Sequence, residues 1–202
     1  MTEVSINKQV KLSQHFTLGE LCKTGVKTAD GNIPSHVHIE NLKRVCEWLE
    51  ELRRRYNQQY VCENEERSVS PPELGGARGG LNEGMSGASS DHPTHTGTPP
   101  NSGGEIDTEE PIIITSGYRS QELNKKVGGS PTSNHLTGCA VDIRVYGVEQ
   151  AMRYAVILMD YADETKQDYD ELLIERNRSG GYWLHFAVRP KDNRRKTKFL
   201  QK

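Results

Sequence analysis

Five polar side chains in the second half of the sequence have types and spacing suited to metal-assisted chemistry. His135 and Asp142 lie close together, and His185 stands in a later apolar segment. Zinc accepts imidazole and carboxylate ligands, and three such ligands leave a fourth position open for water. Glu175 is a candidate general base, and Arg119 is a candidate fork for a substrate carboxylate or a developing oxyanion.

A turn must separate His135 from Asp142 if both are to hold one ion. Their separation corresponds to about 23 Å along a strand or about 10 Å along a helix, whereas a zinc ligand lies about 2 Å from its ion. Gly138 lies between them and permits the chain to fold back. We therefore expect His135 on a loop and Asp142 on a strand.

Side-chain alternation and a hairpin register decide which residues share a face. Asp142 alternates with apolar neighbours in a predicted strand, so it points away from the core. If Arg176 pairs with Tyr182 across a hairpin, Glu175 lies diagonal to His185 on one face. A slip of one residue would turn Glu175 to the other face.

The same residues also have structural interpretations. A histidine beside a tryptophan is commonly part of a core, Asp142 can be a strand-edge charge, and Arg119 can be a salt-bridge partner. The sequence contains no compact signature such as His-Glu-x-x-His. Spacing alone therefore leaves both a metal site and a metal-free structural domain open.

Composition limits the class of protein. The chain has 202 residues, a net charge of -2 and a hydrophobic fraction of 33%, which is low for its length. This charge predicts no nucleic-acid partner, and the lack of an apolar stretch of about 20 residues predicts no membrane insertion. We also expect a monomer. Without a CxxC pair, the cysteines predict neither a zinc ribbon nor disulfides: they are Cys22, Cys46, Cys62 and Cys139.

Helical and strand patterns predict an α+β chain in one domain over residues 12–190. Residues 1–11 are predicted to be a flexible arm, residues 63–110 a disordered Gly/Pro/Ser-rich insertion, and residues 191–202 a solvated basic tail. Helices are expected before a largely antiparallel sheet. The expected helices are 18–22, 36–56, 121–127 and 147–161, and the expected strands are 112–115, 139–145, 172–176 and 182–189.

Several spaced motifs carry a resemblance to a known family. They read Ser116-Gly117-Tyr118-Arg119-Ser120, Thr132-Ser133-Asn134-His135, Gly138-Cys139-Ala140-Val141-Asp142-Ile143 and Trp183-Leu184-His185. In this order they resemble the M15 family of zinc metallopeptidases, the D-Ala-D-Ala carboxypeptidases and related peptidoglycan peptidases such as phage endolysins. The likeness covers about residues 11–60 and 111–189.

This resemblance implies an antiparallel sheet flanked by helices, as in the D-Ala-D-Ala peptidases and the hedgehog signalling domain. It implies one zinc ion bound by His135, Asp142 and His185. Arg119 is implied to bind substrate, and Ser133 and Trp183 of the same motifs are predicted to contact it. The implied activity is hydrolysis of a peptide bond in peptidoglycan stem peptides, of the carboxypeptidase or endopeptidase type.

One departure from the family pattern favours a second hypothesis. Many members carry a base glutamate three residues before the last histidine, where this chain has Tyr182. The most similar branch instead has a glutamate on the preceding strand, at the position of Glu175. The alternative is a non-catalytic zinc-binding module that recognises cell-wall peptides or a protein partner.

The N-terminal residues show no signal-peptide pattern, so we expect synthesis in the cytoplasm. An enzyme of the cell wall would then need another exit, and phage-type release through a membrane pore is the expected one.

Overall fold

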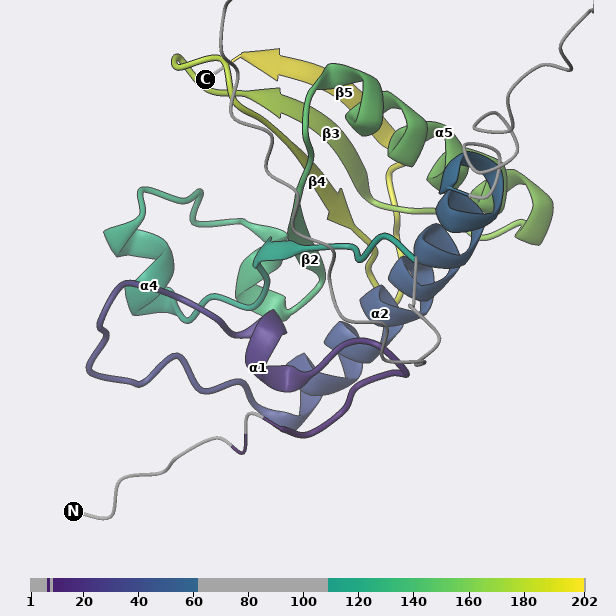
Figure 1. The fold of residues 1–202 in the computed structure, drawn as a ribbon. Coiled ribbons are helices and arrows are strands. Elements are labelled where there is room, and N and C mark those ends of the chain that lie inside the picture. The colour runs from purple at the N-terminus through teal and green to yellow at the C-terminus, as the bar shows by residue number, and fades with distance from the viewer. Residues whose placement is uncertain (1–6, 8, 62–108, 202) are drawn as a thin grey trace, which may run out of the picture.

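The computed structural model describes residue 7 and residues 9–61 and 109–201 (Figure 1). The predicted α+β class is confirmed. The predicted disordered insertion lies outside the described residues except for its last two positions. The elements are α1 (Leu18–Leu21), α2 (His36–Tyr56), η1 (Asn57–Val61), β1 (Ile114–Ser116), α4 (Gln121–Lys126), η2 (Asn134–Thr137), β2 (Ala140–Arg144), α5 (Val148–Thr165), β3 (Glu171–Arg176), β4 (Tyr182–Ala187) and β5 (Lys196–Gln201).

Local sequence signals explain the starts of the helices. Thr17 and Glu20 form a reciprocal capping box at α1, as their spacing predicts. Ser35 begins α2 in the same way, with the ring of His38 accepting from its backbone N–H. Ser120 caps α4 by accepting from the Leu123 N–H.

The sheet has strand order β1-β2-β4-β3-β5. Its first four strands pair antiparallel, as predicted, but β5 runs parallel to β3. The largely antiparallel sheet that the sequence predicts is therefore confirmed, with one parallel pair at this edge. Residues 196–201, which the sequence predicts as part of a solvated tail, form the edge strand β5, in which most residues are exposed.

A buried carboxylate explains why the C-terminal segment folds back. Asp170 is 0% exposed, and it binds the guanidinium groups of Arg189 and Arg194, each at 2.6 Å. Asn134 donates to the same carboxylate at 2.7 Å. A buried charge needs such partners, so Asp170 draws the segment before β5 onto the start of β3.

Helices α2 and α5 cover one face of the sheet, as Figure 1 shows. Trp48 of α2 is 1% exposed, with its ring centroid 5.4 Å from that of Phe186 and 4.9 Å from that of Tyr161. The strands bury alternate residues on this face, namely Val141, Ile143, Leu184 and Phe186. Their intervening residues point to the opposite face.

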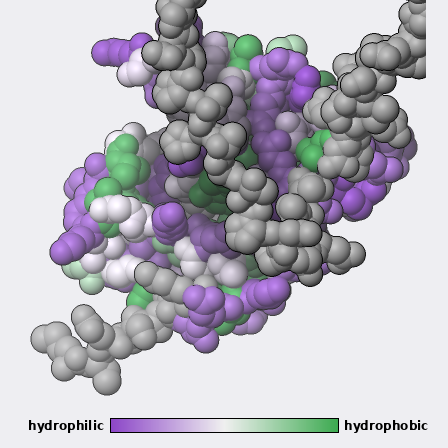
Figure 2. Space-filling view, viewed as in Figure 1, coloured by the Kyte–Doolittle hydropathy of each residue, from purple (hydrophilic) through white to green (hydrophobic). Residues whose placement is uncertain are grey.

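The surface on the side shown in Figure 2 is largely hydrophilic, with apolar residues in small separate patches. Among the described helices, none has the length and apolar character that crossing a membrane requires.

The two chain segments that flank residues 62–108 are tied to each other. Asn57 accepts from the Glu110 backbone N–H at 2.6 Å and donates to the Glu110 carbonyl at 3.1 Å. Arg53 pairs with Glu109 at 3.0 Å beside them. The chain therefore leaves and rejoins the domain at one place.

Replacing residues 62–108 with a Gly/Ser linker of about eight residues should leave the fold intact. The shorter loop should raise the free energy of unfolding by about 1.5 kcal/mol, because closing a short loop costs less entropy. Urea denaturation measures this change. A Gly/Ser linker of the original length is the control and should leave stability unchanged; a drop in stability with both linkers would contradict the prediction.

Candidate metal centre

The register between β2 and β4 brings two of the predicted ligands together. Asp142 and His185 are direct cross-strand partners, on the sheet face opposite α2 and α5. Direct partners have Cβ atoms about 5 Å apart, which is within reach of one ion. The predicted hairpin register is also present, since Arg176 pairs with Tyr182 and Glu175 with Trp183.

His135 comes from the short 3-10 helix η2, which ends in a reversal at Gly138. Gly138 has φ +71°, a left-handed conformation that favours glycine. A Cβ there would lie 2.6 Å from the His38 carbonyl oxygen of α2. Asn41 of α2 also donates to the Thr137 carbonyl at 2.9 Å. The chain reversal at Gly138, which the sequence predicts, therefore packs against α2.

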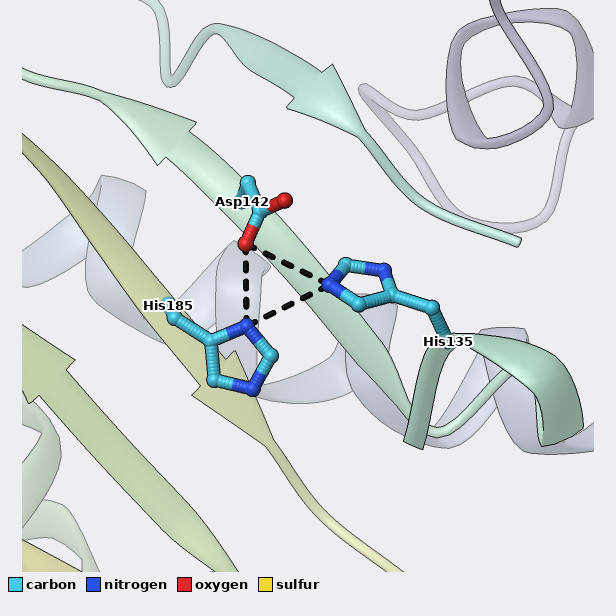
Figure 3. Close-up of side chains that lie close together, drawn as sticks. All are labelled: His135, Asp142 and His185. Carbon is cyan, nitrogen blue, oxygen red and sulfur yellow. Dashed lines mark hydrogen bonds and ion pairs between the residues drawn. The ribbon is translucent and has the colours of Figure 1, made fainter. Parts of the chain in front are cut away.

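The three predicted ligands present one atom each to a common point (Figure 3). The Nδ1 atom of His185 lies 2.9 Å from Oδ1 of Asp142 and 3.3 Å from Nε2 of His135. That Nε2 atom lies 3.3 Å from the same Oδ1 atom. Among the described residues, this is the group of histidine, cysteine and carboxylate side chains that could hold a metal ion.

The second ring nitrogen of His135 is held by the backbone. Its Nδ1 atom lies 2.6 Å from the carbonyl oxygen of Gly117, which fixes Nδ1–H as the donor and leaves Nε2 free of hydrogen. Gly117 needs to be glycine, because a Cβ there would collide with the Leu21 carbonyl oxygen. The spacing of the predicted ligands in the sequence does not predict this close approach of the Gly117 loop to α1.

The second oxygen of Asp142 is held by Arg119. The guanidinium Nη2 donates to Oδ2 of Asp142 at 2.6 Å, and Nε donates to Ser116 Oγ at 2.9 Å. Arg119, which the sequence predicts to bind substrate, therefore already donates a hydrogen bond to the candidate metal ligand Asp142. Arg119 also lines the adjacent pocket.

A carboxylate that the sequence does not single out faces the far side of His185. Oε2 of Glu171 lies 3.6 Å from Nε2 of His185, and Oε1 accepts from Lys196 at 2.7 Å. Glu171 has the same strand parity as Leu173 and Glu175, so alternation could have identified it. It falls one residue before the predicted strand.

Electrostatics in this metal-free arrangement follow from burial and charge pairing. Burial lowers the pKa of His135. Burial alone would raise the pKa of Asp142, but His135 and His185 hold it well below its usual range. Burial opposes charge on His185 too, yet the carboxylates of Asp142, Glu171 and Glu175 raise its pKa to about 9. The contact with His185, then Lys196, lowers the pKa of Glu171.

A pocket of about 590 Å³ opens onto the three ligands. The other predicted site residues, Ser133, Glu175 and Trp183, all line it. Ser133 also caps η2, since its hydroxyl accepts from the His135 N–H at 3.3 Å. Tyr182 lies on the opposite strand face, where its ring contacts Phe199.

Two histidines and an aspartate beside a pocket with further carboxylates and an arginine are typical of a metal-dependent hydrolase. Residues 105–167 match the family model described as Peptidase M15, and this match supports an M15 family peptidase. The match agrees with the family prediction over these residues. Peptidases of this family are generally metal-dependent.

The matched segment includes Arg119, His135 and Asp142 and ends before Glu175 and His185. A search of curated proteins found no match to the chain.

Gly138→Ala tests the reversal that carries His135. Gly128→Ala is a matched control, because Gly128 has φ +70° but an added Cβ would meet nothing within 4 Å. The control should lose about 1–2 kcal/mol of unfolding free energy from backbone strain alone. Gly138→Ala should lose about 1–3 kcal/mol more from the clash with α2. Equal losses in urea denaturation would contradict the close approach.

Proposed function

We propose that this protein is a zinc-dependent peptidase that hydrolyses a peptide bond in peptidoglycan stem peptides, as a D-Ala-D-Ala carboxypeptidase or an endopeptidase. The observation that carries the proposal is the convergence of His135, Asp142 and His185 beside a pocket, in a chain that matches the M15 peptidase family. The cell wall is then the place of action, with phage-type release as the proposed route.

The three candidate ligands fit zinc. Ligand atoms about 2.0–2.1 Å from a tetrahedral ion lie about 3.3 Å from one another. The three distances among these ligand atoms are 2.9, 3.3 and 3.3 Å. Two nitrogens and one oxygen suit zinc better than the hard cations, which prefer oxygen ligands alone.

The proposed chemistry divides between the ion and the pocket residues. A zinc ion bound there would act as a Lewis acid. It would lower the pKa of a water molecule, so that the water could lose a proton and attack a carbonyl at neutral pH. Glu175 takes the proton of the attacking water and gives it to the leaving amine. Glu175 is suited to this role because it lines the pocket, is 4% exposed as a residue, and shares a strand face with Leu173, the cross-strand partner of His185.

The register of β3 with β4 also weakens the argument for the alternative function, a non-catalytic zinc-binding module. Tyr182 occupies the position where many M15 members carry a base, and it is three residues before His185. Residues three apart on a regular strand point to opposite faces, so this position is turned away from the pocket. A tyrosine at this position therefore removes no base from the pocket, and Glu175 on β3 remains available.

Arg119 is proposed to serve two partners. It orients Asp142 through Nη2, and it presents its pocket side to a carboxylate of the stem peptide. Ser133 and Trp183 are proposed to contact the same peptide from the pocket wall.

Metal analysis by mass spectrometry is the first test. Wild-type protein reconstituted with zinc should hold one ion per chain, and His185→Ala should lose it. His36→Ala is the matched control, because the His36 side chain is 87% exposed and lies outside the site. Wild-type protein that stays free of metal would overturn the proposal.

Glu175→Gln separates catalysis from metal binding. This variant should keep its zinc while its rate of D-Ala release or muropeptide cleavage falls about 10²–10⁴-fold, the usual contribution of a general base. Glu149→Gln, an exposed glutamate, should match wild type. Zinc-loaded wild-type protein that binds muropeptides without turnover would instead favour the recognition module.

Arg119→Lys tests the double role of the arginine. Lysine keeps the charge but cannot contact both Ser116 and Asp142 through one planar fork. We expect about 10–100-fold weaker zinc binding, measured by chelator competition, because partners that orient a ligand have effects of this size. A raised KM with unchanged zinc affinity would show that the contact of Arg119 with Asp142 does not contribute to zinc binding.

A further inference from the structure

Glu171 connects the metal centre to the C-terminal strand. Its Oε2 atom faces Nε2 of His185 at 3.6 Å and accepts from Asn134 at 3.1 Å. Its Oε1 atom accepts from Lys196 at 2.7 Å and lies 3.1 Å from Nη2 of Arg194. The side chain is largely buried, with 15% exposed. Both carboxylate oxygens are therefore engaged inside the pocket.

The place of Glu171 matters because the two ring nitrogens of His185 have different tasks. Nδ1 faces Asp142 and His135, where a metal would be held. Nε2 must then carry the hydrogen, and the orientation of the His185 ring depends on the group that this Nε2–H faces. A carboxylate at this position selects that tautomer and holds the ring plane.

We propose that Glu171 is a positioning residue of the metal centre: it orients His185 through Nε2, and Lys196 of β5 holds Glu171 in place. This inference rests on the proposed function, since it concerns the same metal site. It separates the roles of two glutamates on β3, with Glu175 acting on substrate and Glu171 acting through His185.

The parallel pairing of β3 with β5 supplies the second half of the argument. Glu171 and Lys196 are direct cross-strand partners, so the ammonium group reaches the carboxylate from a neighbouring strand. Lys198 is two residues further along the same strand face and is exposed, opposite Leu173. Lys198 is therefore a matched control for Lys196.

Zinc affinity, measured by chelator competition, tests the proposal. Glu171→Ala should bind zinc about 10–100-fold more weakly than wild type. Glu171→Gln should lose less, because its amide oxygen can still face Nε2–H of His185. Lys196→Met should fall between wild type and Glu171→Ala, and Lys198→Met should match wild type. Wild-type affinity in Glu171→Ala would overturn the proposal.

Nuclear magnetic resonance of the imidazole groups gives a readout that a merely structural role would not change. In wild-type protein, the Nε2–H proton of His185 should be protected from exchange with water, and Glu171→Ala should abolish this protection while the backbone spectrum stays folded. The measurement works with or without zinc. If wild-type protein binds no metal, the proposed function fails, and unchanged protection in Glu171→Ala separately overturns the role of Glu171.

Discussion

The pairing of β2 with β4 is the constraint on which the site depends. It sets Asp142 opposite His185, so two side chains from distant parts of the sequence share one face. A slip of one residue would send one of them into the apolar core. That slip is opposed by the other face of the same strands, where Val141, Ile143, Leu184 and Phe186 are fully buried under the helices. Core packing thus sets the geometry of the polar face.

Each candidate ligand has its second polar atom held by a different part of the fold. The Gly117 carbonyl holds His135, Arg119 holds Asp142, and the carboxylate of Glu171 faces His185. These contacts orient the ligand atoms towards a common point before any ion binds. A site built in this way loses little entropy on binding a metal, because its side chains are already ordered.

The local parts of this arrangement were predictable from the sequence. The capping box of α1, the alternation in the strands and the Arg176–Tyr182 hairpin register follow from interactions between residues near each other in the chain. The reversal at Gly138 follows from a distance argument alone. The predicted strand began one residue after Glu171 and therefore missed it, because the ends of a strand depend on the strands with which it pairs.

The sequence by itself determined the candidate ligand types, the face on which Asp142 lies, and the α+β class, because alternation and turn chemistry are local properties of the chain. The face of Glu175 followed only if Arg176 pairs with Tyr182, and the structure supplies that register. Only the tertiary structure decided that the basic tail becomes β5, that Lys196 meets Glu171, and that Arg119 is engaged with Asp142. The physical reason is that parallel strand pairing and buried charge pairs join residues without any fixed separation in sequence.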